Sequence, residues 1–66
     1  MKLQITAVVN GKTYLSAITE SFESVRACHI TLLELPEMVM GLEDGTTLVL
    51  RTEVLQHTHF IIKEVL

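Results

Sequence analysis

The sequence predicts a mainly β fold, either a small antiparallel sheet or an SH3-like barrel of five or six strands. Three observations carry this expectation. Asn10-Gly11 and Asp44-Gly45 are dipeptides typical of tight hairpin turns, and each lies between segments rich in β-branched and apolar residues. The 66 residues also contain no linker, repeat or low-complexity tract. We therefore expect one small domain over residues 1–66.

The first two strands are expected on either side of Asn10-Gly11. Both central positions of a type I′ turn need a positive φ, which Asn and Gly tolerate best. The flanking segments, KLQITAVV and KTYLSAIT, then pair in the register that this two-residue loop fixes. The pairs expected on the core side are Val9 with Lys12, Ala7 with Tyr14, Ile5 with Ser16, and Leu3 with Ile18.

The middle of the chain is expected to contain a short helical turn and a strand. Ser21 can cap a helical turn near residues 21–25, because its hydroxyl accepts a hydrogen bond from a free backbone N–H. Apolar residues then alternate with other residues, so we predict a strand over residues 26–35. The residues expected on its buried face are Cys28, Ile30 and Leu32.

Asp44-Gly45 is expected to form a second two-residue turn, between EMVMGLE and TTLVLRT. Both faces of this hairpin are apolar. One face would therefore pack on the core, and the other would contact a partner or a second copy of the chain. The cross-strand pairs expected in this register are Met40 with Val49 and Val39 with Leu50.

The C-terminal segment, RTEVLQHTHFIIKEVL, fits two structures. Thr, Phe and the paired Ile residues favour a strand from Thr58 onward, which we predict. The alternative is a helix over residues 53–65, because apolar residues there recur at spacings of three and four. The choice decides the meaning of His57 and His59. On a strand both side chains would lie on one face, whereas on a helix they would point in different directions.

Composition restricts the partners and the location. The net charge is −3 and the five Lys and Arg residues are scattered, so direct binding of nucleic acid is disfavoured. A hydrophobic content of 48% is more than so small a domain easily buries. We therefore expect a protein partner and a homo-oligomer, a dimer or larger. No apolar run is long enough for a membrane span and no signal peptide is evident, so we expect a cytoplasmic protein without membrane contact.

No arrangement of reactive residues predicts an enzyme. Cys28 and His29 are adjacent, so on a strand they would point to opposite faces and could not act as nucleophile and base. His57 and His59 are the candidate metal ligands, and a third ligand would have to come from Cys28 or His29. We therefore predict no catalytic residue, no bound cofactor and no metal site.

The sequence instead favours binding. We expect a non-enzymatic protein-interaction module, of the kind with which a phage or mobile element inhibits a host protein. The alternative is a nucleic-acid-linked regulator, either an oligomeric barrel that binds RNA or DNA or an acidic mimic of DNA that inhibits a DNA-binding protein. The expected interface residues are Met38, Met40, Val49 and Arg51, and the expected acidic contact face consists of Glu20, Glu23, Glu37, Glu43 and Asp44.

Overall fold

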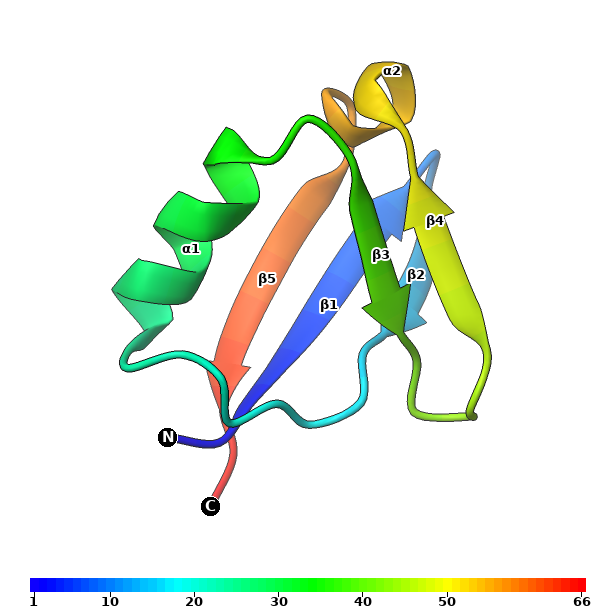
Figure 1. The fold of residues 1–66 in the computed structure, drawn as a ribbon. Helices are drawn as coiled ribbons and strands as arrows, with labels where there is room; N and C mark the ends of the chain where they lie inside the picture. The colour runs from blue at the N-terminus through cyan, green and yellow to red at the C-terminus, as the bar shows by residue number, and fades with distance from the viewer.

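The computed structural model describes all 66 residues and contains five strands and two helices (Figure 1). In chain order the elements are β1 (Leu3–Val9), β2 (Lys12–Leu15), α1 (Val25–Glu34), β3 (Met38–Gly41), β4 (Thr47–Leu50), α2 (Thr52–Leu55) and β5 (His59–Glu64). β1 is the central strand of an antiparallel sheet in the order β2-β1-β5, and β3 and β4 form a separate two-stranded sheet. The predicted mainly β class is confirmed.

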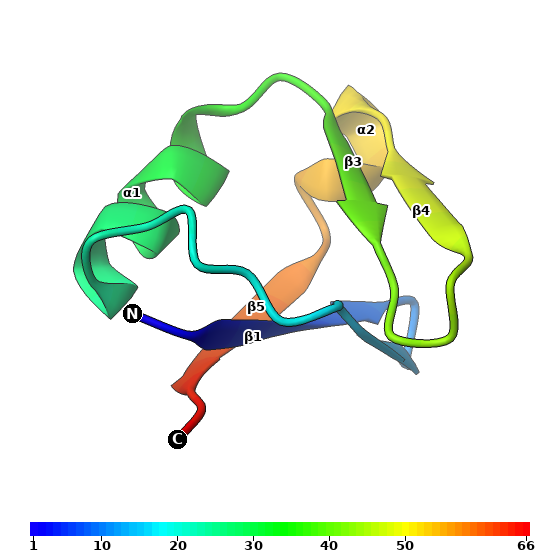
Figure 2. The same ribbon diagram turned by 60° about the horizontal axis from the view of Figure 1, so that its bottom comes forward.

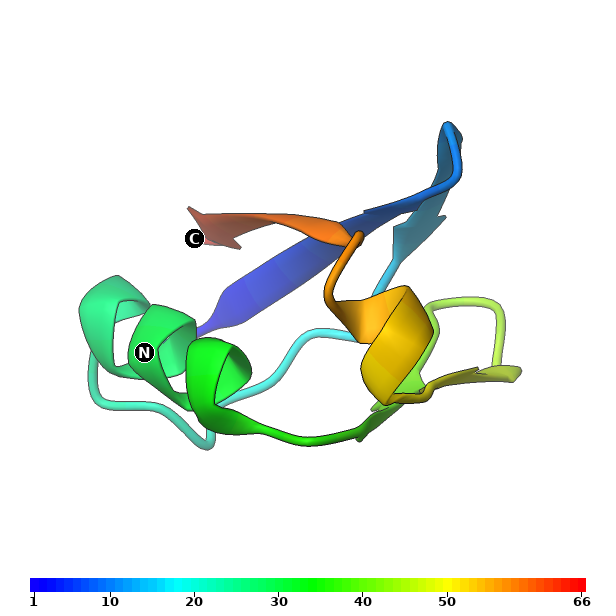
Figure 3. The same cartoon turned by 90° about the horizontal axis from the view of Figure 1, so that it is seen from above.

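The molecule has two layers. α1 and the β3–β4 hairpin both lie on one face of the β2-β1-β5 sheet, and no element covers the other face of that sheet (Figures 2 and 3). An isolated antiparallel bridge between Ser16 and Leu42 joins the two sheets. The strands therefore form two sheets that meet at one point, with the core between the layers.

The first hairpin has the predicted turn. Asn10 and Gly11 have φ values of 50° and 79°, as a type I′ turn requires. The register that follows from this turn is also confirmed for β1 and β2. The pairs are Val9 with Lys12, Val8 with Thr13, Ala7 with Tyr14, and Thr6 with Leu15.

The register changes by one residue after Ser16. The Ser16 N–H donates to the Ile5 carbonyl at 2.8 Å, but the Ile5 N–H donates to the Ser16 hydroxyl, also at 2.8 Å, instead of the Ser16 carbonyl. Beyond this point Leu3 pairs with Thr19, and the predicted pairing of Leu3 with Ile18 is wrong. A bulge therefore begins at Ser16, where a side chain replaces a backbone acceptor. The Asn10-Gly11 turn could not predict this bulge, because a turn determines which residues pair only as long as the pairing of the two strands stays regular.

The strand predicted over residues 26–35 is wrong, because this part of the chain forms α1. The buried side chains of α1 are Cys28 and Leu32, which are four residues apart and therefore share one face of a helix. Ile30, expected on the same buried face of a strand, is 44% exposed. The alternation of apolar residues thus did not correspond to burial.

Ser24 determines where α1 begins. Its backbone is extended, and its hydroxyl accepts a hydrogen bond from the Ala27 N–H at 3.0 Å. The predicted cap, Ser21, lies outside the helix, and its N–H donates to the Thr19 hydroxyl at 3.3 Å. The helical turn predicted near residues 21–25 is therefore replaced by a helix of ten residues that starts at the end of this range.

The second hairpin closes with a three-residue loop, Glu43-Asp44-Gly45, and not with the predicted two-residue turn. The Leu42 N–H donates to the Thr46 carbonyl at 2.8 Å, and the Gly45 N–H donates to the Leu42 carbonyl at 3.0 Å. Gly45 has a φ of 89°, the left-handed conformation that such a loop needs at its last residue. The register is therefore shifted by one residue. The observed pairs are Met38 with Leu50, Val39 with Val49, Met40 with Leu48, and Gly41 with Thr47.

The C-terminal strand predicted from Thr58 onward is confirmed, and it begins one residue later, at His59. This strand, β5, pairs antiparallel with β1. The alternative helix over residues 53–65 is wrong, because helix is limited to the single turn of α2. His57 lies in the turn that follows α2, where its N–H donates to the Val54 carbonyl at 3.1 Å.

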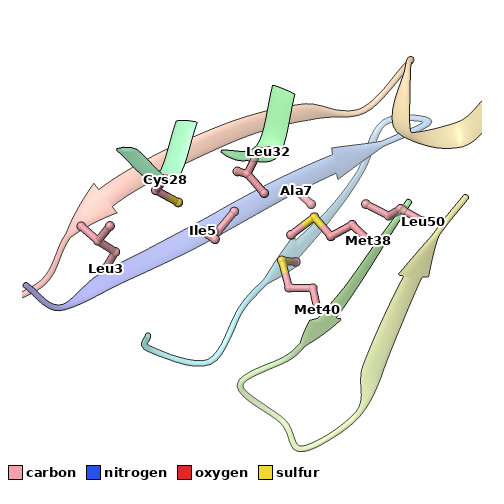
Figure 4. Close-up of a cluster of buried hydrophobic side chains, with 8 residues drawn as sticks. All are labelled: Leu3, Ile5, Ala7, Cys28, Leu32, Met38, Met40 and Leu50. Carbon is pink, nitrogen blue, oxygen red and sulfur yellow. The ribbon is translucent and has the colours of Figure 1, made fainter. Parts of the chain in front are cut away.

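The core between the layers consists of eight buried apolar residues (Figure 4). Three come from the inner face of β1, and the others come from α1 and from the β3–β4 hairpin. They are Leu3, Ile5, Ala7, Cys28, Leu32, Met38, Met40 and Leu50. The rings of Tyr14, Phe22 and Phe60 are partly buried and pack against this cluster. Most of the remaining apolar surface is therefore left at least partly exposed.

Candidate protein-binding surface

The predicted interface residues separate into two groups. Met38 and Met40 point inward from β3 and are 8% and 4% exposed, so they belong to the core. Val49 lies on the opposite face of the hairpin and is 54% exposed. Arg51 follows it by two residues in extended backbone and is also exposed. The register shift explains the separation, because Val49 pairs with Val39 and not with Met40.

The outward side of β3 and β4, which we call the hairpin outer face, has an apolar centre. Val39 and Val49 are directly paired, and their exposed fractions are 69% and 54%. Glu37 precedes β3 and Arg51 follows β4, so opposite charges stand at one end of the valine pair. No element of the fold covers this face (Figure 3). Its residues are Val39, Gly41, Thr47, Val49 and Arg51.

The five predicted acidic residues lie in three separate segments of the chain. One place is the segment before α1, the second is the start of β3, and the third is the loop at the other end of β3. The residues are, in this order, Glu20 and Glu23, then Glu37, then Glu43 and Asp44. The acidic residues therefore come from three different parts of the fold and not from one strand or helix.

Local hydrogen bonds hold two of these carboxylates. Thr46 donates to the Asp44 carboxylate from its hydroxyl at 2.6 Å and from its backbone N–H at 2.9 Å. These bonds lower the pKa of Asp44 below its ordinary value, because they stabilise the charged form. The Gln4 side chain donates to Glu43 at 3.1 Å. Both carboxylates thus have a structural role at the loop.

The histidines and the cysteine do not assemble a reactive site. His57 lies in a turn and His59 lies in β5, so the two are not successive residues on one strand face. Cys28 is fully buried, and burial raises the pKa of its thiol. The thiol is therefore protonated at neutral pH and out of reach of reagents. No group of three His, Cys, Asp or Glu side chains lies close enough together to hold a metal ion.

A groove lies between β3 and α1, and we call it the β3–α1 groove. Its volume is about 440 Å³, which is within the range of ligand-binding pockets. Core side chains, including Leu32 and Met40, line its floor. Ile18, which is 54% exposed, and Leu35, which is 37% exposed, contribute apolar surface to its rim. The groove is therefore apolar and open to solvent.

β3 presents an unpaired backbone edge to this groove. Hydrogen-bonding direction alternates along an antiparallel strand. The Leu42 N–H bonds to Thr46 across the hairpin, so the N–H and C=O groups of Gly41 and Val39 point away from β4. The Gly41 carbonyl confirms this direction, because it accepts the Ala17 N–H at 2.9 Å. The Val39 N–H and C=O and the Gly41 N–H have no backbone partner in the chain.

Comparisons with known proteins identify no relative. The chain matches no protein-family model, no curated protein and no solved structure. Neither helix has the length and apolar character that crossing a membrane requires. Function must therefore be inferred from the hairpin outer face and the β3–α1 groove themselves.

The β3–α1 groove could not be found from the sequence, because one of its walls is the helix where the sequence predicts a strand. A signal for that helix was nevertheless present. Cys28, Leu32 and Leu35 follow one another at spacings of four and three, which is typical of the apolar stripe of a helix. Phe22 is a single aromatic residue in a polar segment, and it lines the same groove.

Proposed function

We propose that this chain is a non-enzymatic protein-interaction module that binds another protein through the hairpin outer face. The observation that carries the proposal is the Val39–Val49 pair. Two β-branched side chains lie directly opposite each other and are 69% and 54% exposed, in a protein with only eight buried apolar core residues. Adjacent exposed apolar side chains are typical of surfaces that a partner covers.

The free energy available from covering this face is that of a contact of moderate affinity. Complete burial of a valine side chain contributes about 1.5–3 kcal/mol. Covering the exposed parts of Val39 and Val49, 69% and 54% of the two residues, would therefore contribute about 2–4 kcal/mol in total. Glu37 and Arg51 at one end of the pair would orient the partner, because flanking charges affect specificity and association rate more than affinity.

Catalysis and mimicry of DNA have less support. Glu37 is the one titratable residue that lines the β3–α1 groove, whereas acid–base catalysis needs several converging groups. A mimic of DNA would need a continuous acidic surface, and the acidic residues lie at separate places. A module that binds without chemistry acts by occupying its partner, as a phage or mobile-element inhibitor of a host protein does.

Val49→Asp tests the proposal, with Ile61→Asp as the matched control. Both changes replace an exposed β-branched side chain on a strand, because Val49 is 54% and Ile61 is 52% exposed. Ile61 pairs with Thr6 on the uncovered face of the other sheet. The wild type and both variants would be immobilised and incubated with a lysate of the cells in which the protein naturally occurs. The retained proteins would then be quantified by mass spectrometry.

We expect the wild type and Ile61→Asp to retain the same protein, and Val49→Asp to retain about tenfold less of it. Tenfold corresponds to about 1.4 kcal/mol, which matches the loss of one buried valine contact. Circular dichroism would check that all three proteins are folded. Equal retention by three folded proteins would contradict the proposal.

A further inference from the structure

We propose that the β3–α1 groove binds an extended segment of the partner, which adds to β3 as a third strand of the β3–β4 sheet. This inference rests on the proposed function, because it names the form of the protein that the module binds. Strand addition needs an accessible strand edge for the main chain and pockets for alternate side chains. The groove provides both of these features.

The strand edge is defined by backbone groups that only an extended chain can satisfy together. The Val39 N–H and C=O point away from β4 and have no backbone partner, and the Gly41 N–H points in the same direction. Donor and acceptor alternate along this edge as they do at the edge of any sheet. A partner segment lying in the groove would pair with all three groups, whereas a helix has no free backbone groups to offer along its length.

The side chains of such a segment would find two different environments. Successive residues of a strand point to opposite faces. One set would point to the groove floor, which is formed by Ile5, Leu32, Met38 and Met40. The other set would lie beside Val39 and extend the hairpin outer face. We therefore expect apolar residues at alternate positions of the bound segment.

Charge adds a preference at one end. Glu37 is exposed and is the one titratable residue in the lining of the groove. It lies at the start of β3, whereas Ala17 closes the groove at the other end by donating to the Gly41 carbonyl. A Lys or Arg near Glu37 would therefore complement the site, and acidic residues there would be disfavoured.

The shape of the site favours a single segment over the edge of a second folded copy. α1 stands on the far side of the groove from β3, and the segment from Ala17 to Phe22 runs between them (Figure 2). The edge strand of a second copy would bring its neighbouring strand and its own core, which would meet α1. One extended chain does not have this obstacle.

The bulge at Ser16 explains why the edge is free. At this residue the chain changes from regular pairing with β1 to the bridge with Leu42, and it then returns to β1 at Thr19. The segment therefore forms a backbone hydrogen bond with β3 only at Gly41, and none with Val39. The edge of β3 is thus already free in the folded protein, and a pre-formed site loses less free energy to ordering when a ligand binds.

Val39→Pro tests the proposal, with Thr13→Pro on the edge strand β2 as the matched control. Proline removes a backbone N–H, and both residues direct this group away from the strand with which they pair, so neither change breaks a bond between paired strands. Only Val39 lines the groove, and Thr13 lies outside both proposed binding surfaces. A phage-displayed library of random nine-residue peptides would be selected on the wild type, and the affinities of the enriched peptides would be measured for all three proteins.

We expect enriched peptides with alternating apolar residues that bind Val39→Pro at least tenfold more weakly than the wild type and bind Thr13→Pro within twofold. Nuclear magnetic resonance would show the largest amide shifts at Val39 and Gly41. The proposal is overturned if no peptide is enriched, or if enriched peptides bind Val39→Pro as tightly as the wild type. It is also overturned if light scattering shows that a second copy occupies β3 and that Val39→Pro disrupts this association.

The two proposals can fail separately. Peptides that bind in the groove while Val49→Asp retains its native partner would support strand addition and contradict binding through the outer face. Loss of the native partner in Val49→Asp, without any enriched peptide, would support binding through the outer face alone. Thermal melts of the two proline variants would confirm that both remain folded.

Discussion

Ser16 shows how one side chain can determine the course of the backbone. It is the only buried polar residue, with an exposed fraction of 3%. Its hydroxyl accepts the Ile5 N–H and donates to the Ala17 carbonyl at 2.9 Å. The chain can therefore leave β1 here without leaving a buried N–H unpaired. Sequence patterns do not reveal such a role, because a serine in a strand is ordinarily a surface residue.

Replacing Ser16 with alanine is expected to lower the free energy of unfolding by about 1–3 kcal/mol, because the Ile5 N–H would remain buried without a partner. Urea denaturation followed by circular dichroism measures the change. Thr13→Ala is the control, because Thr13 is exposed and lies on the neighbouring strand β2. We expect this control to cost less than about 1 kcal/mol. Equal losses in the two variants would show that the Ser16 hydroxyl has no special role.

At the scale of elements, the two hairpins show what turn chemistry determines and what it leaves open. In the first hairpin Asn10 and Gly11 both have positive φ, so the loop length and the register follow directly from the dipeptide. In the second hairpin only Gly45 has positive φ, and Asp44 instead accepts hydrogen bonds from Thr46. An Asp-Gly pair is compatible with both loop lengths. The register of β3 and β4 therefore could not be predicted from the sequence.

The helix α1 shows a second limit at this scale. Its sequence, VRACHITLLE, contains β-branched residues and an apolar alternation that favour a strand. It also contains Cys28 and Leu32 at helical spacing. In the folded protein these two side chains are buried in one cluster with the residues of the inner face of β1. Tertiary packing thus overrides local preference in this segment. The proposed strand-addition site depends on this outcome, because α1 forms one wall of the β3–α1 groove.

Gly45→Ala and Gly41→Ala form a matched pair that tests the loop of the second hairpin. Gly45 has a φ of 89°, whereas Gly41 does not have a positive φ, and neither position has an atom within 4 Å of an added Cβ. We expect Gly45→Ala to lower the free energy of unfolding by about 1–2 kcal/mol, because an L side chain strains the left-handed conformation. Gly41→Ala should be neutral or slightly stabilising. Thermal denaturation of both variants measures the difference, and a cost at Gly41 equal to that at Gly45 would argue against the three-residue loop.

At the scale of the whole molecule, the sequence predicted the class of fold but not how its parts meet. Length, composition and turn signals were sufficient for a single mainly β chain with a C-terminal strand. The junction of the two sheets depends on the bridge between Ser16 and Leu42, which lie far apart in the chain. Such a contact forms only because the bulge redirects the backbone. The free edge of β3 is a consequence of this junction, whereas the exposed valine pair follows from the register of the second hairpin.

The distribution of charge leads to the last prediction, which concerns salt. The protein has one ion pair, between Lys2 and Glu20 at 4.0 Å, and the two side chains are 57% and 66% exposed. Exposed pairs of this kind contribute about 0–1 kcal/mol. The stability must therefore come mainly from the core and the backbone hydrogen bonds. Raising NaCl from about 0.1 M to about 1 M shortens the screening length from roughly 10 Å to roughly 3 Å.

We expect this change in NaCl to alter the free energy of unfolding by less than about 1 kcal/mol, because there is little surface attraction to screen. Lys2→Gln should lose less than about 1 kcal/mol and should show the same salt dependence as the wild type. Urea denaturation of both proteins at the two salt concentrations measures these quantities. A decrease of several kcal/mol at high salt would mean that charges, and not the two-layer core, hold this small fold together.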